Sequence, residues 1–445
     1  MGGAPINSSR SPATSAYVAF AAFGSFWGVW GASVPRVQHQ AGVSDGQLGF
    51  ALLFVGAGAL PAMLLAGRAL DRWGPNVAAG AISLLGMVGA GLALTAVNLP
   101  SLCVGLGIAG ASSGAADVTM NAVAGRAENV TGRPVLARAH GAFSTFVVLT
   151  SLGAGITSAA SWPLAVPFIG VAALCLLAGA TMLKAIPHRT AIRDIDTTAA
   201  KAPSPNRTRI VPLVLIGVLG ALAFASENAH QSWSAVFAQD ELHAGAGLTT
   251  VAPAVFAGTV AITRFSIGGL KTVHARPVIL TGALAAAGGA LVIAGAPTLP
   301  IATLGLVMAG AGTAVLFPTL LGTVSRNVEE TYRGRATSIV STISYLGFLL
   351  GPVYVGVSAD TAGLRGAMIA VAALAAALFV LTPPLFHLSG FTGNRIPRRG
   401  TGSPLPPRSH RRRRREGEAP RETRVSATAT PARSFLRIRG KCNRS

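Results

Sequence analysis

The octapeptide GRALDRWG at residues 67–74 is a short charged stretch between two long apolar segments. Residues 48–66 before it and 77–97 after it contain no Asp, Glu, Lys or Arg. A helix needs roughly 20 apolar residues to cross the hydrocarbon core of a membrane, and both segments supply them. The glycines of the octapeptide permit a tight turn, and Asp71 lies near the next helix start, where negative charge is favourable. The octapeptide is therefore predicted to be a loop joining two membrane-spanning helices.

Composition extends this prediction to the whole chain. Of its 445 residues 51% are hydrophobic, only 11% are charged and 54 are glycine, which indicates closely packed transmembrane helices. The three cysteines show no disulfide or metal spacing, so neither a metal nor a cofactor is predicted. No Walker loop and no catalytic triad is found, which argues against an ATP-driven pump and against an enzyme. The Gly105-x-Gly107-x-x-Gly110 pattern lies inside an apolar span, so helix packing explains it better than dinucleotide binding.

Hydropathy predicts an all-α membrane protein with about twelve spans in two six-helix bundles. We expect an N-terminal segment at 1–15, a first bundle at 16–183, a central loop at 184–209, a second bundle at 210–387 and a basic tail at 388–445. The predicted spans are residues 16–34, 48–66, 77–97, 101–125, 139–160, 163–183, 210–237, 247–267, 277–295, 299–323, 337–357 and 366–387.

The distribution of lysine and arginine predicts the orientation. With both termini in the cytoplasm, 34 of the 36 basic residues fall on the cytoplasmic side, and only Arg36 and Arg365 face outward. Cytoplasmic loops are enriched in positive charge. The N-terminus shows no convincing signal-peptide cleavage site, so the first span is expected to be retained.

Similar residue patterns recur between the two halves. Gly105-Leu106 and Ala109-Gly110-Ala111 match Gly305-Leu306 and Ala309-Gly310-Ala311 at an offset of 200 residues. Arg138-Ala139 matches Arg335-Ala336 at a nearby offset of 197. These matches predict an internal duplication.

The tail after His387 carries +13 of the net charge of +21 and includes five consecutive arginines at 411–415. It is too polar to bury a core. A solvated cytoplasmic extension is the simple interpretation, and contact with anionic lipids is the alternative. Nucleic-acid binding is not expected, because no folded nucleic-acid module accompanies the charge.

With these spans, the sequence Gly67-x-x-x-Asp71-Arg72-x-Gly74 resembles the loop motif between the second and third helices of the major facilitator superfamily of secondary transporters. The resemblance covers about residues 17–387. It implies that Gly67, Asp71, Arg72 and Gly74 form a gating loop that meets helix ends of the opposite half in one conformation. Pro75 and Asn76 replace the basic pair that usually follows the motif.

Four further stretches resemble a bacterial inner-membrane subgroup related to fucose-type symporters: residues 43–49, 117–122, 227–236 and 345–352. A family motif associated with antiport places a Gly-Pro turn in the fifth helix. Residues 151–155 contain no proline, which disfavours a drug–proton exchanger.

Asp117 is the most informative ionisable residue. Nine residues separate it from Arg126, which places it roughly 13 Å inside the cytoplasmic boundary at 1.5 Å per residue, near the midplane. A carboxylate there is costly unless it is hydrated, paired or protonated. Asn121 follows at i+4 on the same helix face. We expect a substrate or proton site, and a fixed interhelical hydrogen bond is the alternative.

Glu227, His230 and Gln231 form a second predicted polar stripe, in the seventh span. It is a candidate lining for a water-filled path, and structural pairing of Glu227 with His230 is the alternative.

Trp27 and Trp30 recur with Phe23 at helical spacing in the first span and are candidates for stacking on a sugar ring, although such stripes more often serve packing. His140, at the inner end of the fifth span, is expected to be a loop contact, with a proton relay as the alternative.

These observations predict a monomeric, multi-pass transporter of the bacterial inner membrane that binds a small molecule near the midplane and works by alternating access. Proton-coupled symport of a polar or sugar-like solute, with Asp117 or Glu227 taking the proton, is the leading hypothesis. Export of amphiphilic compounds by proton antiport is the alternative within the same fold. A membrane sensor or scaffold that acts through its basic tail is the alternative of another class.

Overall fold

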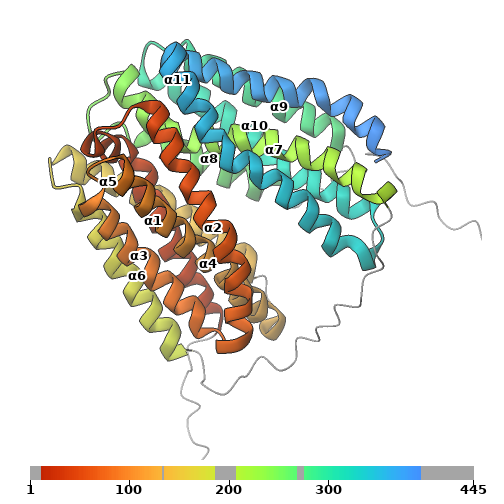
Figure 1. The fold of residues 1–445 in the computed structure, drawn as a ribbon, viewed down its shortest axis with the longest axis horizontal. Helices are drawn as coiled ribbons and strands as arrows, with labels where there is room; N and C mark the ends of the chain where they lie inside the picture. Colours follow the sequence, from red (N-terminus) through yellow and green to blue (C-terminus); the bar gives the residue numbers. More distant parts are fainter. Residues whose placement is uncertain (1–11, 133–134, 186–206, 268–274, 392–445) are drawn as a thin grey trace, which may run out of the picture. The chain divides into compact units, whose positions relative to one another are not determined.

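The apolar segments fold into helices because the hydrocarbon core offers backbone N–H and C=O groups no partner outside the protein. The computed structural model describes residues 12–132, 135–185, 207–267 and 275–391. Among these residues the structure contains helices joined by turns, and no strand (Figure 1). All of them belong to one unit of the chain.

Six helices make up the first half of the described chain. A capping box starts α2, because the Ser44 hydroxyl accepts from the Gln47 N–H while the Gln47 side chain accepts from the Ser44 N–H. Pro61 lies inside α2. The bounds are α1 (Pro12–Ala41), α2 (Asp45–Trp73), α3 (Asn76–Thr95), α4 (Leu99–Thr131), α5 (Val135–Ala159) and α6 (Ala165–Ala185).

The second half contains α7 (Arg207–Val236), the short π-helix η1 (Phe237–Glu241), α8 (Val251–Ile267), α9 (Ala275–Ala294), α10 (Leu299–Asn327) and α11 (Glu330–Ser389). A non-helical residue, Gly363 at φ 72°, divides α11 into two segments. Among the described residues ten helices are long and apolar enough to cross a membrane, and Val251–Ser266 is a shorter apolar helix. With α11 counted as two, the described residues form twelve α-helical segments besides η1. The predicted all-α fold with about twelve spans is therefore confirmed.

Helix pairing repeats between the two halves. In the first half α1 packs on α5, α2 on α4 and α3 on α6; in the second half α7 and α9 both pack on α11, and α8 on α10. The repeated glycines follow this symmetry: a Cβ at Gly105 would meet α3 and one at Gly305 would meet α9. Likewise, a Cβ at Gly110 would meet α2 and one at Gly310 would meet α8. The matched residues thus make equivalent contacts, as a duplicated architecture requires.

The octapeptide 67–74 differs from the sequence-based expectation of a loop. Residues 67–73 continue α2 for two further turns, and the chain reverses only at Gly74, whose φ is 72°. Arg68, Ala69 and Leu70 are good helix formers, and glycine adopts positive φ at low cost, so the helix ends there. The Arg72 guanidinium lies 5.8 Å above the ring of Trp73. The side chain of Asp71 lies outside the described part of the structure.

The two halves approach each other closely where α2 begins, beside α11 (Figure 1). The Asp360 carboxylate accepts a hydrogen bond of 2.8 Å from the Gly46 N–H and one of 3.3 Å from the Ser44 hydroxyl. A Cβ at Gly49 would lie 2.9 Å from the Pro352 carbonyl oxygen, and one at Gly356 would lie 2.6 Å from that of Asp45. At the other end of α2, neither Gly67 nor Gly74 has a neighbouring atom within 4 Å of such a Cβ. Close contact between α2 and α11 is therefore concentrated at one end of α2.

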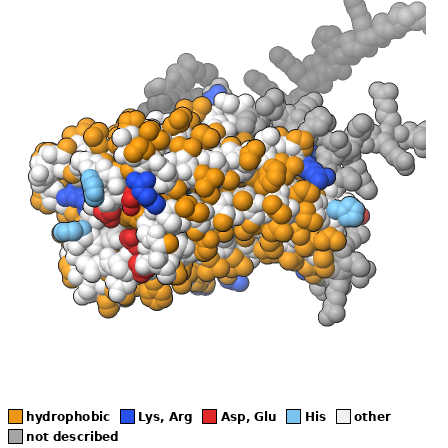
Figure 2. Space-filling view, turned by 90° about the horizontal axis from the view of Figure 1, so that it is seen from above, with side chains coloured by type: hydrophobic (Ala, Val, Ile, Leu, Met, Phe, Trp, Pro, Cys, Tyr) orange, Lys and Arg blue, Asp and Glu red, His pale blue; other side chains and the backbone are white. Residues whose placement is uncertain are grey.

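The outer surface of the helices is strongly apolar. Hydrophobic side chains dominate the face shown in Figure 2, and most of the charged side chains in view gather toward its left end. Large side chains such as Leu64, Ile156 and Ile262 are about 70% exposed. Such a surface is suited to lipid rather than to water, and the predicted multi-pass membrane protein is confirmed.

The close approach of α2 and α11 can be tested with Gly356→Leu. The new side chain has no room beside the Asp45 carbonyl, so this variant is expected to lose about 1–3 kcal/mol of stability through overpacking. Its unfolding temperature in detergent should fall by several degrees. Gly80→Leu is the matched control, because Gly80 lies on a helix and its Cβ would meet nothing within 4 Å. Equal destabilisation of both variants would contradict the assigned contact.

Candidate functional site

A cavity of about 370 Å³ lies between helices of the two halves. Its walls come from α1, α2, α4 and α5 of the first half and from α7, α8 and α11 of the second. The volume falls within the usual range for sites that bind small molecules. Because both halves contribute, any movement of one half against the other changes the shape of the cavity.

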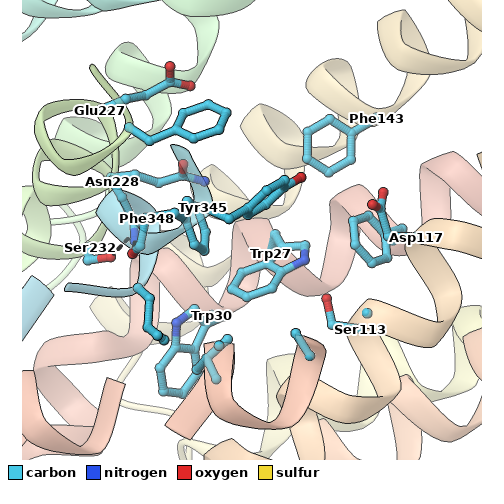
Figure 3. A pocket seen from close by; sticks show the side chains of 18 of the residues that line it. Trp27, Trp30, Ser113, Asp117, Phe143, Glu227, Asn228, Ser232, Tyr345 and Phe348 are labelled. Carbon is cyan, nitrogen blue, oxygen red and sulfur yellow. Dashed lines mark hydrogen bonds between the residues drawn. The ribbon is translucent and has the colours of Figure 1, made fainter. Parts of the chain in front are cut away.

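Aromatic side chains form much of the cavity wall. In the first half, the Phe23 ring lies 5.8 Å from Phe143, and in the second half the Tyr345 ring lies 5.5 Å from Phe224 and 6.2 Å from Phe348. Aromatic faces offer large apolar contact areas with a polarisable π surface. The sequence-predicted Trp27 and Trp30 are both part of this wall (Figure 3). The full set is Phe20, Phe23, Trp27, Trp30, Phe143, Phe224, Tyr345 and Phe348.

Asp117 lies in the wall contributed by α4. Its carboxylate accepts a hydrogen bond of 3.0 Å from the Asn121 side-chain amide, which also donates to the Asp117 backbone carbonyl at 2.8 Å. Both residues belong to α4, so this bond lies within one helix, whereas the sequence-based alternative was a bond between helices. Asn121 itself does not line the cavity. Its side-chain amide holds the Asp117 carboxylate in place from outside the cavity lining.

Glu227 forms an ion pair with Arg264 in the wall contributed by the second half. One guanidinium nitrogen of Arg264 donates to both carboxylate oxygens of Glu227, at 2.8 and 2.9 Å. The side chain of Glu227 is 15% exposed and that of Arg264 is 42% exposed. The predicted eighth span at 247–267 includes Arg264, although the distribution of basic residues counted it on the cytoplasmic side. The structure places it within α8, where it faces the cavity.

His230 lies outside the cavity, although it is three residues from Glu227. Its Nδ1 is 2.7 Å from the Ser226 carbonyl oxygen, and its ring stacks on Phe256 with the centroids 5.5 Å apart. At roughly 100° per residue, Gln231 falls on one side of Glu227 and His230 on the other. The cavity lies on the side of Gln231. Glu227 and Gln231 of the predicted polar stripe therefore line the cavity, and His230 does not. The alternative pairing of Glu227 with His230 is wrong, because Glu227 pairs with Arg264.

Several cavity residues were missed by the sequence analysis. Asn228 donates a bond of 2.6 Å to the Phe348 carbonyl and accepts one of 3.2 Å from Ser232, which joins α7 to α11. Its position next to Glu227 was the available signal. Tyr345 and Phe348 were noted only within a stretch of family resemblance. His140 was expected to be a loop contact, but it lines the cavity, with its ring edge-on to Phe20 at 4.8 Å.

The family model of the Major Facilitator Superfamily matches residues 16–274 and 270–438. The chain belongs to this superfamily. The resemblance of the octapeptide at residues 67–74 to its loop motif therefore reflects true membership.

Curated relatives cover most of the chain. An uncharacterized transporter, y4wD, of Sinorhizobium fredii is 27% identical over 356 residues, 79% of this chain and 92% of the relative. An uncharacterized MFS-type transporter of Yersinia pestis is 28% identical over 351 residues, 77% of this chain and 87% of the relative. Membrane protein MosC of Rhizobium meliloti is 27% identical over 357 residues, 77% of this chain and 82% of the relative.

Solved structures share the fold at low sequence identity. The nucleoside transporter NupG aligns with a TM-score of 0.68 at 13% identity, covering 84% of this chain and 99% of NupG. The xylose transporter XylE of E. coli, in an inward open conformation, aligns with a TM-score of 0.65 at 15% identity, covering 84% of this chain and 95% of XylE. These structures confirm the superfamily fold with two bundles. The family model and the transporter relatives show that the chain is a secondary transporter.

The Glu227–Arg264 pair can be tested by a double-mutant cycle. Glu227→Gln and Arg264→Gln should each lower stability by about 1–2 kcal/mol, because each leaves a partly buried charge without its partner. Water around the more exposed Arg264 keeps the loss below that of a fully buried pair. The double variant should lose clearly less than the sum of the two, as measured by denaturation in detergent. Arg72→Gln is the control, and additive losses for Glu227 and Arg264 would contradict the pair.

Proposed function

We propose that this member of the superfamily is a proton-coupled symporter that takes up a small polar or sugar-like solute by alternating access. The observation that carries the proposal is the cavity between the halves, whose wall holds one carboxylate in each half, Asp117 and Glu227. During alternating access the cavity opens to water on one side of the membrane and then on the other. Between these two states a carboxylate in the cavity lies in a low-dielectric site, where its protonated, neutral form costs less free energy than its charged form. Binding of a proton can therefore be coupled to movement of the solute.

The distribution of basic residues supports an orientation with both termini in the cytoplasm of a bacterial inner membrane. In this orientation the end of α2 at Asp45 faces outward and the turn at Gly74 faces the cytoplasm. Arg36 and Arg365, the two basic residues assigned to the outside, lie in helix ends on the Asp45 side: Arg36 donates to the Trp162 carbonyl and Arg365 pairs with Glu241. Because α2 and α11 touch near Asp45, the structure corresponds to an inward-facing state in this orientation.

The stretches at 43–49, 117–122, 227–236 and 345–352 support placement near fucose-type symporters. Three of them contribute to the cavity and the first forms the contact between α2 and α11. Among proteins of the same fold are XylE and a D-xylose-proton symporter. At such low identity these structures support the fold only, and the proposal of a sugar-like substrate is based on the residues that line the cavity.

The gating role of Gly67, Asp71, Arg72 and Gly74 is likewise proposed: they would meet the opposite half when the cytoplasmic end closes.

Proton coupling can be tested in proteoliposomes with a panel of radiolabelled sugars. An acidic exterior should accelerate uptake by the native protein. Removing whichever carboxylate takes the coupling proton, by Asp117→Asn or by Glu227→Gln, should abolish this acceleration. Counterflow without a pH gradient separates loss of coupling from loss of binding. If both variants keep the full acceleration, neither carboxylate takes the coupling proton. Solute leaving in exchange for entering protons would instead identify an exporter.

The basic tail is proposed to be a solvated extension that transport does not require. A protein truncated after Phe391 retains Gly390, which ends α11 in the left-handed conformation, and should show unchanged uptake. If a cellular phenotype disappears while uptake persists, the sensor or scaffold hypothesis is favoured. Weaker binding to anionic vesicles on truncation would support lipid contact.

A further inference from the structure

The charges in the cavity wall do not balance. Glu227 and Arg264 neutralise each other through two hydrogen bonds. Asp117 has no such partner: among the described residues, no Lys or Arg forms an ion pair with it, and its carboxylate is bonded only by the neutral amide of Asn121. The ionised cavity therefore carries one uncompensated negative charge.

Aromatic rings line the same cavity as this carboxylate. In Figure 3, Phe143 lies on the side of the cavity where Asp117 lies, Glu227 and Asn228 lie on the opposite side, and Trp27 and Tyr345 lie between the two sides. The faces of aromatic rings attract cations, and the attraction grows when water is excluded. A positively charged ligand group is thus favoured both by the carboxylate and by the rings.

Other ligand chemistries satisfy the site less well. An anionic group would be repelled by Asp117, and the Arg264 cation is already engaged by Glu227. A neutral hydroxyl can donate a hydrogen bond to the carboxylate but leaves its charge uncompensated, which is costly in a low-dielectric site. Ser113 in the first half and Gln231 and Ser232 in the second supply neutral polar groups for the rest of a ligand.

We propose that the substrate is an organic cation, a ring-sized molecule whose protonated amino group binds at Asp117 between the aromatic rings. This inference rests on the proposed transport function and deepens it. Asp117 then serves the solute, and Glu227 is left for the coupling proton.

The test compares ligands that differ only in charge, with purified full-length protein in detergent. Glucosamine and glucose form one pair, and cyclohexylamine and cyclohexanol the other; in each pair an amino group replaces a hydroxyl on the same ring. A ligand that binds the folded protein raises its unfolding temperature. At least one amine should bind the native protein at least tenfold more tightly than its neutral counterpart, at a pH where the amine is protonated.

Variants assign this preference to Asp117. Asp117→Asn should abolish it, and Asp117→Glu, which keeps the charge, should retain part of it. Glu128→Gln is the control, because Glu128 lies on the same helix outside the cavity and accepts a bond from the Leu136 N–H; its preference should match that of the native protein. An Asp117→Asn protein that keeps its unliganded unfolding temperature is folded, so its loss of preference reports on binding.

The proposal is overturned if the neutral member of each pair binds as well as the amine, if neither amine binds at ~10 mM, or if Asp117→Asn keeps the preference. Each result leaves the transport proposal standing, because the readout is binding alone. Conversely, a protein that binds amines but shows no uptake driven by a pH gradient contradicts proton coupling and leaves the assignment of Asp117 intact.

Discussion

The contact between α2 and α11 depends on a carboxylate at a helix N-terminus. Asp360 accepts hydrogen bonds from the first turn of α2, where the unpaired N–H groups and the helix dipole favour negative charge. Glycines at the crossing let the two backbones touch. This contact lies at the end of α2 away from Gly74, and a bond between an exposed carboxylate and two donors is weak enough to break when water can replace it. A transporter needs both properties at the same contact.

The fold was largely predictable because membrane insertion imposes strong constraints on sequence. Apolar runs of about 20 residues mark spans, and the spacing between Asp117 and Arg126 is enough to place the carboxylate deep in the fourth helix. Trp27 and Trp30 could be proposed as candidates for substrate contact because side chains at helical spacing share one face of a helix. These features depend on one helix at a time.

Two of the three features that escaped prediction depend on more than one helix. Hydropathy cannot show that residues 67–73 continue α2. It registers the charged residues as a break between two apolar spans, whereas their good helix propensity lets the helix continue. Nor can spacing along α7 decide which side of Glu227 faces the cavity, so His230 was grouped with it although it packs on Phe256. The pairing of Arg264 with Glu227 was not predicted, because Glu227 lies on another helix, 37 residues earlier in the chain. Tertiary neighbours determine the positions of His230 and Arg264, whereas local helix propensity extends α2.

Pro61 gives α2 a mechanical property that its length alone would not. Proline removes one backbone hydrogen bond and clashes with the preceding turn, so a helix bends most easily there. In α2 this point lies beside Ala59, Leu60 and Met63, which line the cavity, and about midway between the Asp360 contact and Gly74. A bend of α2 at Pro61 would therefore change the angle between its two parts at the cavity wall, where a bound solute can favour one angle over another.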